Sequence, residues 1–212
     1  MPCFGVTARN WGSSVPLAIG DFGKQTMSTT KIMLVRHAEK PEGNVLGVTP
    51  DGKNDPEALT VQGWQRAGAL IGIFSPAPGQ VCRPGLATPQ RLFASGSASK
   101  RPQQTLQPLA ARLGMNIDAS IKKEKTDELV KRITEAGGIV LVAWQHEDIP
   151  AIAGEILGSD GICPSEWPGN RFDLVWVLDR STGIAPWSFS QIPQLLLAGD
   201  QASVIPASGA GQ

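Results

Sequence analysis

The chain has 212 residues, of which 41% are hydrophobic and 18% are charged. This length and composition are typical of a folded protein with one main domain, and they exclude an overall disordered or fibrous class. Nineteen basic residues balance nineteen acidic ones, so no overall charge attracts the protein to nucleic acid or to an anionic membrane surface. We therefore expect neither nucleic acid nor a membrane as a partner.

Sequence features that mark other compartments are also missing. No apolar run reaches the roughly 18 residues that a membrane span needs, and the first thirty residues lack the basic start and apolar stretch of a secretory signal. The three cysteines, Cys3, Cys82 and Cys163, have neither the spacing of a disulfide framework nor that of a zinc site. These features predict a cytoplasmic protein.

The N-terminal part of the sequence differs from the rest. Residues 1–30 mix glycine, serine, proline and scattered apolar residues without helical or alternating periodicity. We expect them to form an N-terminal extension and residues 31–212 to form the folded domain. Met27 is a second candidate start, which would place residues 1–26 outside the native protein.

Strand-like and helix-like segments alternate along the predicted domain. In chain order, the pattern predicts a strand at 31–35, a helix at 59–74 with Thr60 as its N-cap, a strand at 91–94, a helix at 102–113 that stops at Gly114, a strand at 139–143 and a helix at 148–157 that stops at Gly158. This alternation predicts an α/β three-layer sandwich, with a mainly parallel central sheet covered by helices on both faces. Segments 172–178 and 184–189 predict a late hairpin that adds antiparallel strands to the sheet.

Two histidines and two arginines fall near the ends of these strands. His37 and His146, the only histidines, each follow a predicted parallel strand; Arg36 precedes His37, and Arg101 follows the strand at 91–94 through a small polar loop. The carboxyl ends of parallel strands form the edge at which α/β sheets bind ligands. Guanidinium groups match phosphate oxygens and stay charged at physiological pH. The four residues therefore predict a phosphate site.

Four ordered segments resemble the motifs of the histidine phosphatase superfamily, which has the phosphoglycerate mutase-like fold. Residues 34–40 (LVRHAEK) are similar to its Arg-His-Gly signature, with alanine in the glycine place. Residues 59–67 are similar to its Leu-Thr-x-x-Gly element, and residues 97–105 to its Ser-x-x-x-Arg-x-x-x-Thr segment. Residues 139–146 resemble the strand that delivers the second histidine, so the resemblance extends over about residues 31–158.

The resemblance implies a phosphatase that hydrolyses phosphomonoesters, or another phosphorylated substrate, through a phosphohistidine intermediate on His37. Arg36, Arg101 and His146 would hold the phosphoryl oxygens, so that the reaction needs neither a metal nor a cofactor. The asparagine of the mutase branch is not reproduced at the family's spacing, which disfavours mutase activity. A phosphorylated small molecule and a phosphoprotein both stay open as substrate, and the sequence does not determine the oligomeric state.

The acid that protonates the leaving group has several candidates. Glu147 follows His146 directly, which resembles the His-Asp pair of the acid phosphatase branch, and we predict it as a catalytic residue. Asp148 is the alternative, although its position favours an N-cap of the following helix. Glu124 and Asp127 lie where the mutase-like branch places its acid, but in a charged run typical of a solvent-exposed helix.

Two other functions stay open. The first is a non-catalytic phosphate-binding or regulatory module of the same fold, suggested by Ala38 and by the uncertain acid; binding alone, however, would not require a free nucleophile at His37. The second is a metal site built on the two histidines, for which the sequence offers no obvious third and fourth ligand.

Overall fold

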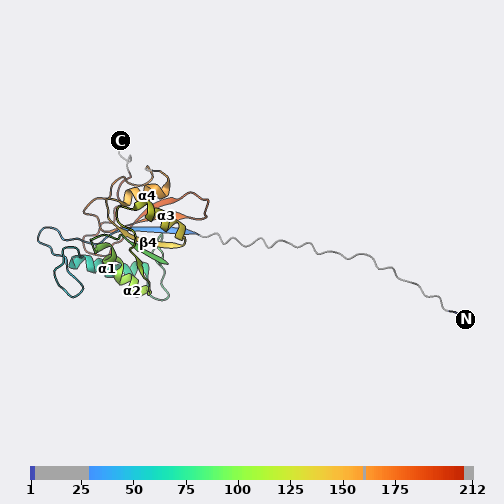
Figure 1. The fold of residues 1–212 in the computed structure, drawn as a ribbon, viewed down its shortest axis with the longest axis horizontal. Helices are drawn as coiled ribbons and strands as arrows, with labels where there is room; N and C mark the ends of the chain where they lie inside the picture. The colour runs from blue at the N-terminus through green and yellow to red at the C-terminus, as the bar shows by residue number, and fades with distance from the viewer. Residues whose placement is uncertain (3–28, 160, 208–212) are drawn as a thin grey trace.

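A computed structural model describes residues 1–2, 29–159 and 161–207 (Figure 1). Most of the predicted N-terminal extension lies outside these residues. The described elements are β1 (Thr30–Arg36), α1 (Val61–Phe74), β2 (Arg91–Ala94), α2 (Arg101–Leu113), β3 (Ile117–Asp118), α3 (Thr126–Ala136), β4 (Ile139–Trp144), α4 (Ile149–Leu157), β5 (Leu174–Arg180) and β6 (Ser188–Pro193).

The strands form one six-stranded sheet in the order β3-β2-β4-β1-β5-β6. The first four strands of this order run parallel to their neighbours, whereas β5 is antiparallel to β1 and β6 is antiparallel to β5. Arg36 lies opposite Trp144, and Ala94 lies opposite Ala143. Because β1, β2 and β4 end level with one another, the residues that follow them meet at one edge of the sheet.

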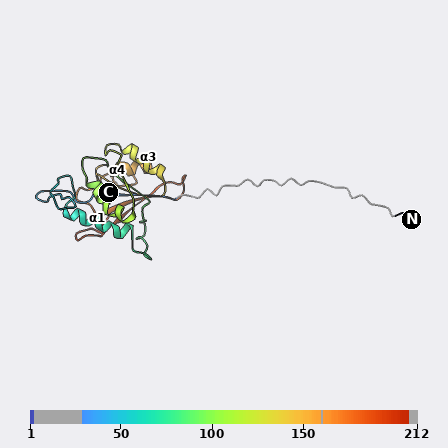
Figure 2. The ribbon, with the colours of Figure 1, turned by 60° about the horizontal axis from the view of Figure 1, so that its bottom comes forward.

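Helices cover both faces of this sheet. Along β1, Ile32 and Leu34 pack in one core cluster with residues of α3 and α4, whereas Met33 and Val35 pack in a second cluster with residues of α1 and α2. The alternation follows from the two-residue period of a strand, which sends successive side chains to opposite faces. Figures 1 and 2 both show α1 on the opposite side of the sheet from α3 and α4. The predicted three-layer α/β sandwich is confirmed.

The helix ends follow the predicted local chemistry. The side chain of Thr60 accepts a hydrogen bond from the backbone N–H of Gly63 at 3.1 Å, which caps α1. Gly114 and Gly158 end α2 and α4 with φ values of 64° and 68°, a left-handed conformation that favours glycine. No helix in the described part of the chain is long and apolar enough to cross a membrane.

The late hairpin lies a few residues further along the chain than predicted. Its strands are β5 and β6 instead of segments 172–178 and 184–189. Ile184, which the alternating pattern assigned to the second strand, is 99% exposed and lies in the loop. The antiparallel pairing itself agrees with the prediction, so the error concerns boundaries and not the type of element.

Candidate active site

His37 lies at the carboxyl end of β1, inside the protein. Its backbone N–H donates to Trp144 O at 3.0 Å, which extends the β1–β4 pairing by one residue, and only 5% of the residue is exposed. Its ring Nδ1 lies 2.8 Å from Ala38 O. A carbonyl oxygen can only accept a hydrogen bond, so Nδ1 carries the proton of the neutral ring. The lone pair is then on Nε2.

The environment of His37 favours this neutral form. Burial lowers its pKa to about 4, and the positive charges of Arg36 and Arg101 act in the same direction. The charge of His146 also lowers this pKa, so all four predicted site residues lie within electrostatic reach of one another. At neutral pH the imidazole is therefore unprotonated and available as a nucleophile.

Arg36 is a buried cation with unused hydrogen-bond donors. Its Nη1 donates to the carbonyl oxygens of Gly169 and Arg171, and its Cζ lies 3.8 Å from the ring centroid of Phe172. Its Nε and Nη2 are buried and have no partner among the described residues. Burial lowers the pKa of Arg36 to about 10, which still leaves the group protonated at neutral pH. A bound anion would satisfy both free donors.

The segment that holds Arg36 is itself anchored by the C-terminal part of the chain. Arg171 donates from Nε to Asp173 Oδ1 and from Nη2 to Ser203 O, each at 2.7 Å. The other carboxylate oxygen of Asp173 accepts from the backbone N–H of Gln201. These contacts fix the carbonyl of Arg171 against the Arg36 guanidinium. No local pattern predicts this arrangement, because Arg36, Ser203 and Gln201 are distant along the chain from Arg171 and Asp173.

Arg101 reaches the site from the first turn of α2. Its Nη1 donates to Pro56 O at 3.0 Å and lies 3.7 Å from Glu57 Oε2, and its Nε is buried without a partner among the described residues. Thr105, one turn later, donates to Arg101 O and accepts from the backbone N–H of Ala38, both at 2.8 Å. Residues 97–105 thus hold residues 34–40 in place, so two of the segments that resemble family motifs are in direct contact.

The second histidine is paired with the residue that follows it. His146 Nδ1 lies 2.9 Å from Glu147 Oε2, and the Glu147 side chain is 65% exposed. Partial burial would raise the pKa of Glu147, but a hydrogen bond from its own backbone N–H and the charges of His146 and Arg36 outweigh this effect and lower it. Glu147 therefore stays ionised, which suits a partner of His146 better than a proton donor.

A cavity of about 550 Å³ opens beside His37. Its walls come from the segments that follow β1 and β4 and from those that precede α2 and α3. The lining residues are His37, Lys40, Glu57, residues 97–99, Arg101 at the start of α2, Lys123, Glu124, Gln145, Glu147 and Asp148. Among the predicted acids, Asp127 is the one that does not line it.

Asp148 does not make the capping hydrogen bond that its position in the sequence predicts. It occupies the N-cap position of α4, but its side chain makes no capping hydrogen bond. Burial raises its pKa, and the neighbouring negative charge of Glu147 adds to the rise. An acid that lines the cavity and holds its proton to higher pH is suited to general acid catalysis.

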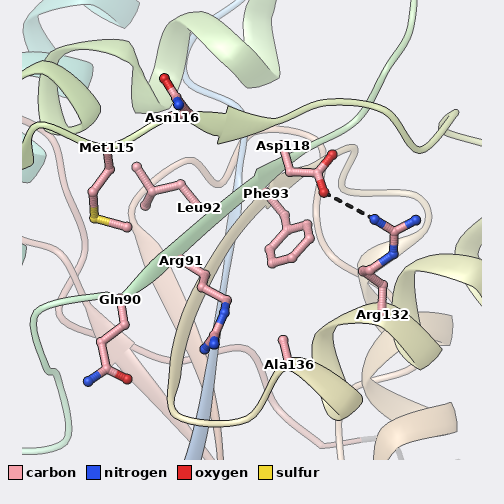
Figure 3. Close-up of a pocket in the computed structure, with 9 residues that line it drawn as sticks. All are labelled: Gln90, Arg91, Leu92, Phe93, Met115, Asn116, Asp118, Arg132 and Ala136. Atoms are coloured by element: carbon pink, nitrogen blue, oxygen red, sulfur yellow. Dashed lines mark hydrogen bonds and ion pairs between the residues drawn. The ribbon is translucent and has the colours of Figure 1, made fainter.

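A second cavity, of about 430 Å³, lies between β2, β3 and α3 (Figure 3). Both arginines in its wall are engaged: Arg132 pairs with Asp118 at 3.4 Å, and Arg91 donates to Gly137 O at 2.8 Å. It contains none of the predicted catalytic residues. The described residues include no group of three or more histidine, cysteine, aspartate or glutamate residues that could hold a metal ion. The cavity beside His37 is therefore the candidate active site.

A buried ion-pair network lies behind this site and was not predicted. Arg66, on α1, donates from Nε and Nη2 to Glu39 Oε1 at 2.9 and 2.8 Å, and from Nη2 to Asp200 Oδ1 at 2.7 Å. Glu39 stands two residues after His37. The one sequence signal for this network was that Arg66 lies in residues 59–67, which resemble a family motif. Its partner Asp200 is 134 residues away along the chain.

Replacing Arg66 with methionine is expected to lower the free energy of unfolding by about 3–5 kcal/mol, because it leaves two buried carboxylates without their cation. Urea denaturation measures the change. Arg132→Met is the matched control: the Arg132 pairs with Asp118 and Glu128 are about half exposed, so its loss should be no more than about 1 kcal/mol. Equal losses in the two variants would contradict the structural importance of the network.

Comparisons with known proteins agree with this architecture. No protein-family model and no curated protein matches the chain. Among solved structures, the protein histidine phosphatase SixA complexed with tungstate matches 77% of this chain and 97% of that chain, with 14% identity and a TM-score of 0.50. Mycobacterial hydrolase 1 matches 76% of this chain and 97% of that chain, with 10% identity and the same TM-score. The chain therefore shares the fold of these two structures, the phosphoglycerate mutase-like fold.

Proposed function

We propose that the protein is a phosphatase that hydrolyses phosphomonoesters, or another phosphorylated substrate, through a phosphohistidine on His37. The observation that carries this proposal is a neutral, buried imidazole beside a buried, charged guanidinium with two unpaired donors. His37 lines the cavity together with Arg101, and Arg36, the residue before His37, lies buried behind the cavity wall. The similarity in fold to a histidine phosphatase that binds tungstate, a tetrahedral oxyanion, supports the same assignment.

In the first step, Nε2 of His37 attacks phosphorus and the bond to the leaving oxygen breaks. Arg36 and Arg101, together with His146, hold the other oxygens, and the two guanidinium groups match the negative charge of the transferring group. Burial and the charge of Arg36 lower the pKa of His146, so the arginines supply the charge that a metal ion supplies in other phosphatases. In the second step, water attacks the phosphohistidine, and inorganic phosphate and the free imidazole are regenerated.

We assign the leaving-group proton to Asp148. This carboxyl group lines the cavity, makes no capping hydrogen bond, and has a raised pKa, so that it is protonated to higher pH than an ordinary aspartate. Glu147, the acid predicted from adjacency, has a lowered pKa and an ion-pair contact with His146. In this scheme Glu147 orients His146, and Asp148 donates to the departing oxygen and then accepts a proton from the attacking water.

The alternative is a phosphate-binding or regulatory module without turnover. It needs the same arginines, but it does not need a histidine held neutral by burial with Nε2 free. Hydrolysis of para-nitrophenyl phosphate by the purified protein, without added metal, separates the two functions, because this leaving group departs readily without a proton.

Vanadate and inorganic phosphate are expected to inhibit this hydrolysis competitively, and Arg36→Met should weaken their binding by about 1.5–3 kcal/mol, the range of a hydrogen bond to a charged group. The inhibition constant measures the effect. Arg83→Met is the control, because Arg83 bonds to the carbonyls of Pro193 and Gln194 outside the cavity. An unchanged inhibition constant in Arg36→Met would remove this residue from the phosphate site.

A further inference from the structure

The wall of the cavity beside His37 is polar throughout. Of its twelve lining residues, Ala98 is the only apolar one, and none other than the catalytic His37 carries an aromatic ring. Ligand pockets are usually lined mainly by apolar and aromatic side chains, which bind the hydrophobic parts of a ligand. Among the described residues, the wall offers no aromatic ring for a nucleobase other than His37 and no apolar patch that could bury an alkyl chain. Its ligand must therefore be hydrophilic beyond the phosphate group.

Besides Arg101 Nε, two hydrogen-bonding groups of the wall residues have no partner among the described residues. Gln145 donates from Nε2 to Ser95 Oγ at 2.8 Å, which fixes the orientation of its amide, while its Oε1 is buried and unpaired. Ser99 Oγ is also buried and unpaired. Buried polar groups are nearly always satisfied in folded proteins. An amide oxygen accepts and a hydroxyl both donates and accepts, so a ligand that carries hydroxyl groups would satisfy both.

The charged residues of the wall extend this pattern. Glu57 and Glu124 present carboxylate oxygens, which accept hydrogen bonds, and Lys40 and Lys123 present ammonium groups, which donate them. Because the wall carries both acceptors and donors, neither a purely anionic nor a purely cationic ligand is favoured beyond the phosphate group. A neutral polyol can use both kinds of group through its hydroxyls.

We infer that the leaving group of the reaction is a polyhydroxylated alcohol, so that the substrate is a sugar or polyol phosphate, with Gln145 and Ser99 contacting its hydroxyl groups. This inference rests on the proposed phosphatase function and adds a substrate class to it. Gln145 and Ser99 act on specificity and do not take part in the transfer of the phosphoryl group.

Matched pairs of substrates test the class. Glycerol 3-phosphate and n-propyl phosphate share a three-carbon chain and differ in hydroxyls; ribose 5-phosphate and adenosine 5′-monophosphate differ by a nucleobase. We expect kcat/KM to be at least about tenfold higher for the hydroxylated member of the first pair and for the base-free member of the second, the scale of one or two hydrogen bonds. Equal values within both pairs would overturn the inference. Faster turnover of a phosphohistidine peptide than of every polyol phosphate would also overturn it.

Variants test the residues. Gln145→Leu and Ser99→Ala should each lower kcat/KM on glycerol 3-phosphate about tenfold more than on para-nitrophenyl phosphate, since the nitrophenyl group has no hydroxyl for either side chain to bind. Gln107→Leu, at an exposed glutamine of α2 outside the cavity, should change neither value. Equal losses on both substrates in both cavity variants would contradict the assignment. If wild-type protein hydrolyses para-nitrophenyl phosphate without preferring polyols, the inference alone fails; if it hydrolyses no phosphate ester, the proposed function fails as well.

Discussion

Replacing His37 with glutamine is expected to lower kcat on para-nitrophenyl phosphate by at least about 10³-fold, because the variant has no nucleophile to form the covalent intermediate. Glutamine can still donate a hydrogen bond to Ala38 O, so the fold should persist, which circular dichroism and urea denaturation check. His146→Gln is the informative companion, because it removes a phosphate ligand and keeps the nucleophile. It should lose less activity. Retention of more than a few per cent of the wild-type rate in His37→Gln would exclude covalent catalysis by this residue.

The pH dependence of the wild-type protein follows from the same residue. Protonated His37 cannot attack, and its pKa lies at about 4. The acidic limb of kcat/KM, which reports the free enzyme, is therefore expected near pH 4, well below the value of about 6.5 for an ordinary histidine. Activity should hold as the pH falls through 6.5 and decrease only as it approaches 4. A half-maximal point near 6.5 would show that burial does not hold His37 neutral in the working protein.

Replacing Asp148 with asparagine is expected to lower the rate on alkyl phosphates by on the order of 10²-fold or more, the usual contribution of general acid catalysis. An alkoxide leaves poorly without a proton, whereas nitrophenolate leaves readily, so the loss on para-nitrophenyl phosphate should be much smaller. The basic limb of the pH profile should also flatten, because it reports ionisation of the donor. Steady-state rates on both esters across the pH range measure these effects.

Two neighbouring acids serve as matched controls for this prediction. Glu147→Gln should lower the rate on both esters to a similar extent, since it disturbs the orientation of His146 and not the proton of the leaving group. Glu124→Gln should affect both esters little, because Glu124 lines the cavity but neither donates the leaving-group proton nor orients His146 in this mechanism. A leaving-group-dependent loss in either control, with none in Asp148→Asn, would move the donor to that residue.

Much of the fold could be predicted because it depends on patterns of residues that are close together in the sequence. The two-residue alternation in β1, the cap formed by Thr60 and the left-handed stop at Gly114 each depend on residues close in sequence. The parallel arrangement of β1, β2 and β4 follows from the helices between them, and it brings the residues after those strands to one edge. The proximity of His37 to the charges of Arg36, Arg101 and His146 follows from that arrangement.

Other features depend on contacts that a linear pattern does not reveal. The bonds of Arg66 to Glu39 and Asp200, and of Arg171 to Ser203, join segments whose pairing is set by packing of the whole chain. The distinction between Glu147 and Asp148 depends on neighbouring groups: a backbone hydrogen bond and the charges of His146 and Arg36 lower the pKa of Glu147, whereas burial and the charge of Glu147 raise that of Asp148. The prediction from adjacency to His146 therefore selected Glu147, the acid that its environment keeps ionised.

Trapping the intermediate tests most directly whether a phosphoryl group passes through His37. The protein is mixed with an excess of para-nitrophenyl phosphate and denatured within the first turnovers in alkali, in which a phosphorylated imidazole persists. Mass spectrometry of its peptides then locates the label. We expect one phosphoryl group on His37 in the wild-type protein and none in His37→Gln. Turnover by the wild-type protein with the label on a different residue, or with His37 never labelled, would contradict the account.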